Sequence, residues 1–193
     1  MNSGDSDAAL MLRVKKGDKA VFRQLIERHQ RAVINMIYRA IGDAWEAEDL
    51  AQRVFVQVYR SAARYEPTAK FTTWLFTITH NMIRNERRRR GRRPAESLEK
   101  LSIPNAPEQT GRQFPDSRIP DPSAAAMYRE LQAAILAAIR ALPENQRTAV
   151  LLSQFEGLSY EEIARVLHCS DSAVKSLLHR ARTTLKDRLR GWY

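Results

Sequence analysis

The sequence predicts an all-α protein made of two small helical domains joined by a flexible linker. Apolar residues recur at helical spacing through most of the chain, and almost no stretch alternates apolar and polar residues as a strand would. Six of the eight prolines are scattered through residues 94–123, which lack apolar periodicity and therefore indicate an extended linker. The 193 residues, 44% of them hydrophobic, are enough to build two small cores.

Capping residues and helix breakers divide the part of the chain before the linker into four expected helices. Gly17 and Gly42 are placed to end helices, because glycine adopts the left-handed backbone that often follows a last turn. Asp18 and Asp43 can cap the helices that follow, and Glu66-Pro67 interrupts the chain before a fourth. The expected helices run from Asp7 to Lys16, from Asp18 to Gly42, from Asp43 onward, and from near Phe71 into a run of arginines.

Four further helical patterns follow the linker. The first two are expected over residues 124–141 and 144–155. Ser159 and Glu162 have the spacing of a capping box at the start of the third, and Ser170 can cap the last after a short turn. The last two patterns form a helix-turn-helix, a motif that places its second helix in the major groove of DNA.

The last helix has a polar and basic face opposite its apolar stripe. Such side chains meet phosphates and base edges when a recognition helix enters the major groove. An ordinary solvated helix face is the alternative interpretation. The side chains expected to contact DNA are Ser172, Lys175, Ser176, His179 and Arg182.

The net charge of +10, from 32 Lys and Arg against 22 Asp and Glu, favours a polyanionic partner. Nucleic acid is the first candidate and a membrane surface is the second. The sequence contains no run of about 18 apolar residues. Its acidic N-terminus does not resemble a signal peptide, so we expect a cytoplasmic protein without membrane insertion. Cys169 is the only cysteine, which excludes an internal disulfide and a cysteine-based zinc site, and we expect no cofactor and no metal.

Seven arginines fall between residues 84 and 93 at the end of the fourth expected helix, relieved only by Glu86. Aromatic residues surround the start of this helix, and aromatic faces next to cations bind unstacked bases in single-stranded nucleic acid. Solvated charge and aromatic core packing are the alternatives, and Trp74 is expected to lie largely in the core. A polar stripe able to follow one strand leads from the loop Tyr65–Lys70 and consists of Thr73, Thr77, Asn81, Arg84 and Arg88.

The third expected helix carries another stripe, opposite its buried residues. An exposed Trp45 among charges is typical of a protein interface. Every amphipathic helix has a polar face, and that alternative stays open. The stripe consists of Asp49, Gln52, Arg53, Val56 and Arg60.

Catalysis is not indicated by the sequence. The four histidines, His29, His80, His168 and His179, do not cluster with carboxylates at the spacing of a metal site or a catalytic triad. The chain has no glycine-rich phosphate loop. These observations favour a binding protein over an enzyme.

Five motifs follow one another along the chain. They are residues 48–55 (EDLAQRVF), 71–81 (FTTWLFTITHN), 142–147 (LPENQR), 162–164 (EIA) and 174–182 (VKSLLHRAR). In this order they resemble the sigma-70 family of RNA polymerase sigma factors, in its small extracytoplasmic-function (ECF) type. The resemblance implies a bacterial transcription initiation factor that binds core RNA polymerase, recognises a promoter and helps to open the duplex. Its domains are then sigma-2 over residues 6–93, a linker over 94–123 and sigma-4 over 124–190.

The resemblance also implies roles for the stripes. Asp49 and Gln52 match the positions that grip the coiled coil of the largest polymerase subunit, and the flap region of the polymerase is a second expected contact. Lys70 and the stripe from Thr73 to Arg88 match the part that captures flipped bases of the minus-10 element. The last helix then reads the minus-35 element. An anti-sigma factor is a further expected partner, because relatives are often held inactive by one.

The chain departs from the family pattern at three places. Arg53 stands where relatives usually carry an acid, which reverses the charge on the polymerase-facing stripe. His168 occupies the turn of the helix-turn-helix, where histidine tolerates a left-handed backbone better than most residues. Leu177 stands where relatives commonly carry an arginine, and either a DNA contact is missing or this side chain touches a thymine methyl group.

A conventional helix-turn-helix repressor or activator that is not a polymerase subunit is the alternative function. It accounts for residues 142–190 but needs neither the stripe with Asp49 and Gln52 nor the aromatic and arginine-rich helix. Binding to core polymerase separates the two functions.

Overall fold

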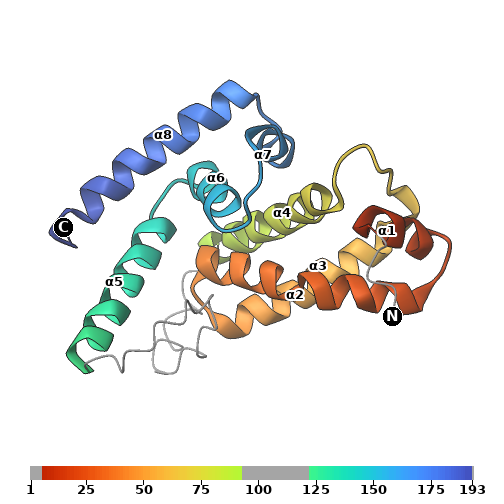
Figure 1. The fold of residues 1–193 in the computed structure, drawn as a ribbon, viewed down its shortest axis with the longest axis horizontal. Helices are drawn as coiled ribbons and strands as arrows, with labels where there is room; N and C mark the ends of the chain where they lie inside the picture. Colours follow the sequence, from red (N-terminus) through yellow and green to blue (C-terminus); the bar gives the residue numbers. More distant parts are fainter. Residues whose placement is uncertain (1–5, 93–121, 193) are drawn as a thin grey trace.

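A computed structural model describes residues 6–92 and 122–192, and every regular element in these ranges is helical (Figure 1). The N-terminal elements are α1 (Asp7–Lys15), α2 (Lys19–Ile41), α3 (Ala44–Arg60), the 3-10 turn η1 (Ala62–Arg64) and α4 (Phe71–Arg92). The C-terminal elements are α5 (Pro122–Arg140), α6 (Glu144–Gln154), α7 (Tyr160–Leu167), α8 (Asp171–Arg188) and the 3-10 turn η4 (Arg190–Trp192). The prediction of an all-α fold with two helical domains is confirmed.

The structure contains the capping interactions from which the helix boundaries are predicted. The carboxylates of Asp18 and Asp43 accept hydrogen bonds from backbone N–H groups at 3.3 and 3.0 Å. Gly42 has a φ of 92°, and its N–H donates to the carbonyl of Tyr38 at 2.8 Å. Helix α2 therefore ends where the sequence predicts, because glycine adopts this left-handed conformation without strain.

Helix α5 begins at Pro122 rather than at the predicted Ala124, inside the predicted linker. Proline is favourable in the first turn of a helix, because the missing N–H has no helical partner there. The rest of the predicted linker, residues 94–121, lies outside the described part of the chain.

The N-terminal core lies between α2, α3 and α4. Leu25 and Ile37 of α2, Val54 of α3 and Leu75 of α4 are all fully buried. Trp74 is half-buried and stacks edge-on against Tyr65, with ring centroids 5.0 Å apart. The apolar stripes of these helices thus supply the burial that stabilises the domain.

The helix-turn-helix of α7 and α8 has the predicted caps. Ser159 and Glu162 form a complete capping box, and the Ser170 hydroxyl accepts the N–H of Ala173 at 3.2 Å. His168 adopts the left-handed conformation, with φ 52° and ψ 48°, so the departure from the family pattern preserves the turn. Cys169 is half-buried beside it, and burial raises the pKa of its thiol.

The two domains pack against each other. Helix α7 packs against α4, and α5 and α6 pack against α2 (Figure 1). His80 Nδ1 of α4 lies 3.2 Å from the Thr148 hydroxyl of α6, and both residues are buried. The Arg39 guanidinium of α2 lies over the Phe155 ring, 4.0 Å from its centroid. Access to the inner face of α4 therefore depends on the position of the C-terminal domain.

Candidate functional site

The stripe predicted on α3 is exposed. Trp45 and Val56 are 82% and 50% exposed, values far above those of the neighbouring core residues. Asp49, Gln52 and Arg53 are also exposed on this helix. Large apolar side chains left in water beside polar ones are typical of a surface that binds another protein.

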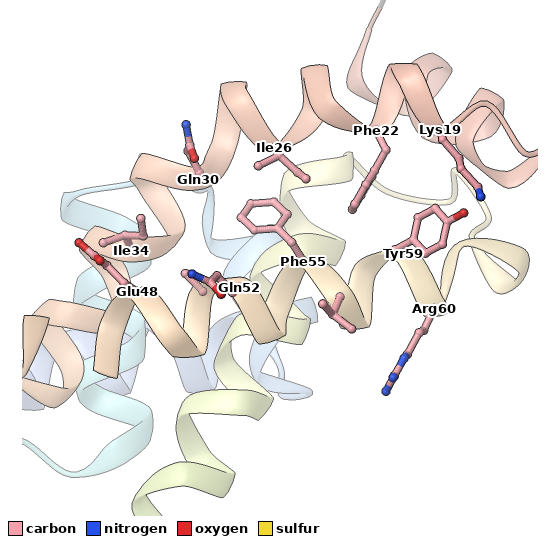
Figure 2. Close-up of a pocket in the computed structure, with 12 residues that line it drawn as sticks. Lys19, Phe22, Ile26, Gln30, Ile34, Glu48, Gln52, Phe55, Tyr59 and Arg60 are labelled. Carbon is pink, nitrogen blue, oxygen red and sulfur yellow. The ribbon is translucent and has the colours of Figure 1, made fainter. Parts of the chain in front are cut away.

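A groove between α2 and α3 borders this stripe. Its volume is about 690 Å³, and Gln52 and Val56 line it together with apolar side chains. Phe22 of α2 points toward α3, and Phe55 of α3 points toward α2 (Figure 2). The rings of Phe22 and Tyr59 lie 5.2 Å apart. The apolar floor with a polar rim suits a helix or coiled coil of a partner.

This groove is a feature that the sequence reasoning missed. Phe22 and Ile26 belong to the same apolar pattern of α2 as the fully buried Leu25. Periodicity marks all three as apolar and does not distinguish a groove lining from a core. Only the packing of α2 on α3 distinguishes them, because it leaves Phe22 and Ile26 lining the groove.

Arg53 does not present an unbalanced positive charge on the stripe. Its guanidinium lies 3.7 Å from the Asp49 carboxylate and 3.8 Å from the carboxylate of Glu86 on α4. Glu86 is only 5% exposed, so this contact draws Arg53 toward the α3–α4 junction. The charge reversal expected from the sequence is therefore offset within the chain.

The arginine run divides into paired and exposed members. Arg87 donates to the carbonyl of Ala40 at 3.2 Å, and Arg89 donates to the Glu86 carboxylate at 2.7 Å. Arg90 pairs with Glu86 and with Glu46 of α3. Arg84 and Arg88 are exposed and lie one turn apart on α4, whereas Arg93 lies outside the described residues. Part of the run thus stabilises the domain, and Arg84 and Arg88 are available for phosphate.

The first residues of the predicted α4 stripe are partly or fully buried in the structure. Thr73 is 3% exposed, and Thr77 is half-buried with its hydroxyl donating to the Thr73 carbonyl at 2.8 Å. Asn81 is half-buried as well. Helical spacing identifies residues on one side of α4, but the packing of α4 against the other helices decides which of them reach solvent.

Lys70 contacts the C-terminal domain. Its ammonium group lies 3.0 Å from the carboxylate of Glu162 on α7. Arg165 of α7 donates to the carbonyl of Thr68 in the same loop at 3.4 Å. Burial acts to raise the pKa of Glu162, but hydrogen bonds from the Ser159 N–H and from Lys70 lower it overall. A carboxylate thus occupies the place beside Lys70 that a phosphate of bound DNA can take.

The predicted DNA-contacting residues of α8 form one exposed face. All five side chains are exposed: Ser172, Lys175, Ser176, His179 and Arg182. The Ser176 hydroxyl donates to the Ser172 carbonyl at 3.0 Å, so it needs to rotate before it donates to a base. Leu177 is half-buried against the core, which makes it a packing residue in place of the arginine of relatives.

One of the four histidines contacts a carboxylate. His29 Nε2 lies 2.8 Å from the Asp7 carboxylate, so this histidine does contact an acid. Their separation in sequence conceals the pair, because α1 packs onto α2. Burial lowers the pKa of His80, which lies between the domains. Within the described residues, no three metal-binding side chains come together and no helix is long and apolar enough to cross a membrane.

The fold and the exposed α8 face define a two-domain helical protein with a DNA-binding helix-turn-helix. Family models for sigma-70 region 2 and sigma-70 region 4 match residues 25–93 and 132–185. The sigma-H factor of Pseudomonas aeruginosa is 36% identical over 188 residues, covering 96% of this chain and 94% of the relative. The chain belongs to the sigma-70 family and is an RNA polymerase sigma factor of the ECF type, a non-catalytic subunit that directs transcription initiation.

Other comparisons agree with this assignment. The ECF sigma-E factor of Escherichia coli is 31% identical over 185 residues, covering 95% of this chain and 94% of the relative. CnrH, solved in complex with the cytosolic domain of CnrY, has the same fold, with a TM-score of 0.69 and 24% identity over 97% of this chain and 99% of CnrH. The sigma factor RpoE of Bartonella quintana, solved with the anti-sigma factor NepR, gives a TM-score of 0.66 and 24% identity over 88% and 96%.

Proposed function

We propose that this sigma factor binds core polymerase mainly through the exposed face of α3 and the adjoining groove. Asp49 and Gln52 contact the coiled coil of the largest subunit, and Val56 packs at the edge of the same contact. The support is the combination of exposed polar and apolar side chains on α3 with an apolar groove beside them. The flap region of the polymerase contacts the sigma-4 domain. The protein therefore acts in the bacterial cytoplasm, at the nucleoid when it is part of the polymerase.

The two promoter elements bind to different domains in this proposal. The exposed face of α8 enters the major groove of the minus-35 element, which is bound as double-stranded DNA. Lys70 and the α4 residues Thr73, Thr77 and Asn81 capture the minus-10 element as single strand, while Arg84 and Arg88 hold its phosphates. Extracting a base costs a few kcal/mol, which stacking and phosphate contacts offset.

An anti-sigma factor is the proposed inhibitor. The support comes from the relatives, since RpoE of Bartonella quintana is solved with the anti-sigma factor NepR. In this chain the groove between α2 and α3 suits a helix of such an inhibitor, in competition with the polymerase.

Promoter-directed initiation is tested by run-off transcription with core bacterial RNA polymerase, with and without this protein. The template is a genomic library that includes the region upstream of its own gene. We expect specific new transcripts that disappear when the minus-35 or minus-10 element of their template is scrambled. An absence of transcripts, with binding to duplex DNA retained without polymerase, would instead favour a conventional repressor or activator.

Capture of the minus-10 strand by α4 requires the two domains to separate. In the structure Lys70 pairs with Glu162, and Thr73 is buried. Thr73 is therefore closed to a DNA strand, and Lys70, although exposed, has its ammonium group engaged by a carboxylate of α7. The chain with its domains packed together is therefore expected to bind single-stranded DNA more weakly than the chain with its domains apart. The apparent affinity falls with the fraction of molecules that are in the binding-competent state.

Removing two interdomain contacts is expected to open the chain. Arg39→Ala combined with Arg165→Ala removes the contact with the Phe155 ring and the hydrogen bond to the Thr68 carbonyl. Spin labels placed by Gln24→Cys and Lys186→Cys in a Cys169→Ser background should show a longer and broader distance distribution. Binding of a single-stranded minus-10 oligonucleotide should tighten by roughly threefold.

The control for this experiment is Arg23→Ala combined with Arg129→Ala. These arginines are exposed on α2 and α5, so the control removes the same charge and leaves the interdomain contacts intact. A longer distance distribution without tighter binding of the oligonucleotide would contradict the interdomain packing as the cause of occlusion.

A further inference from the structure

Glu86 is a buried carboxylate within the arginine run of α4. It is 5% exposed, and a charge in such a position is costly unless it is paired. Arg89 contacts both carboxylate oxygens, with its Nε 3.1 Å from each. The guanidinium groups of Arg90 and Arg53 lie 3.6 and 3.8 Å away. Three cations therefore surround one carboxylate.

These contacts join two helices with different proposed partners. Arg53 belongs to α3, which carries the polymerase-facing residues, and Glu86 belongs to α4, which carries the promoter-facing ones. Arg90 of α4 makes a second link, because it also pairs with Glu46 in the first turn of α3. Asp49 adds a third acid beside Arg53, so the three cations face three carboxylates.

The position of Glu86 on α4 bears on the direction of the exposed arginines. Successive residues of a helix are separated by about 100°, so residues two apart point to roughly opposite sides. Arg84 and Arg88 each lie two residues from Glu86. When Glu86 is held at the α3–α4 junction, both arginines therefore point away from it, and they are exposed in the structure.

We propose that Glu86 is a positioning residue for promoter opening. By gathering Arg53 of α3 and two arginines of α4 around one buried carboxylate, it fixes the rotation of the promoter-facing helix relative to the polymerase-facing helix. The inference rests on the proposed roles of α3 and α4. It also gives Arg53 a function in this chain, as the partner of Glu86, at a position where relatives usually carry an acid.

The test is a double-mutant cycle with Glu86→Gln, Arg53→Glu and the two combined. Glu86→Gln leaves three cations without their shared carboxylate, and Arg53→Glu places a second acid beside Glu86. In the combined variant the new acid faces Arg89 and Arg90 in place of Glu86. Each single change should lower the fraction of open complexes at saturating polymerase by roughly fivefold, and the combination should recover to within about twofold of the parent.

Two measurements accompany the cycle. Affinity for core polymerase should stay within about twofold of the parent in Glu86→Gln, because Asp49 and Gln52 are retained, whereas general unfolding of sigma-2 would lower both affinity and opening. The thermal midpoint read by circular dichroism should show the same coupling, so the cycle remains informative if a single variant is partly unfolded. Glu27→Gln, an exposed carboxylate on α2, is the control for lost charge.

Additive losses in the combined variant would overturn the positioning role, as would unchanged open complexes in Glu86→Gln. The double variant Arg84→Ala and Arg88→Ala distinguishes a failure of the positioning role of Glu86 from a failure of the proposed promoter role of α4. If that pair leaves open complexes unchanged, the promoter role of α4 fails and the inference fails with it. If that pair lowers them while Glu86→Gln does not, only the positioning role is rejected.

Discussion

Changing Asp49 and Gln52 together to alanine is expected to weaken the binding of core RNA polymerase by roughly 30-fold or more. Residues at the centre of an interface commonly contribute about 2 kcal/mol or more, and both side chains lie on the exposed face of α3 beside the groove. Neither is part of the core, so helical content should not change. Loss of the Asp49–Arg53 pair should have little effect on folding, because that pair is largely exposed.

The measurement is an equilibrium titration of labelled protein with purified core polymerase, with circular dichroism recorded on the same samples. The matched control changes Gln24 and Glu27 to alanine, an amide and an acid that are exposed on α2 and do not line the groove. Undiminished binding by the Asp49 and Gln52 variant would reject the assignment of this face. Equal loss in both variants would point to an effect of net charge.

The second large effect is expected on the recognition helix. Lys175→Ala and Arg182→Ala should each weaken binding of the minus-35 duplex by about 1–3 kcal/mol if the side chain contacts a base, which is roughly 5- to 150-fold. Both side chains are exposed on the polar face of α8. A phosphate contact would instead weaken binding evenly across sequences and reduce the dependence of affinity on salt.

These alternatives are separated by titrating promoter and scrambled duplexes at several salt concentrations with each variant. Arg129→Ala is the control, because Arg129 is exposed on α5 and its loss removes one positive charge outside the recognition helix. Parent-like affinity of both variants for promoter DNA would reject the role of this face.

Local signals explain why the helices could be predicted from the sequence. Asp18, Asp43 and Ser159 satisfy backbone donors within three residues of their own positions, so their effect needs no tertiary context. The left-handed turn at His168 is equally local. The ordered motifs also identified the family from the residues, since they extend through both domains.

The surfaces could be predicted only in part. The faces of α3 and α8 are exposed as expected, because no other described element covers them. The stripe on α4 was predicted to follow one DNA strand, and the structure buries Thr73 and pairs the exposed Lys70 with Glu162. Helical periodicity assigns a residue to one side of its own helix, and it contains no information about which helix packs there.

The sequence by itself determined the helices, their caps, the helix-turn-helix and the family. Only the tertiary structure decided three further features: the groove between α2 and α3, the contact of Arg53 with Glu86, and the cover over the start of α4. The physical reason is the range of the interactions. Capping and periodicity act over a few residues, whereas these features join side chains from helices that are distant in the chain and meet only through packing.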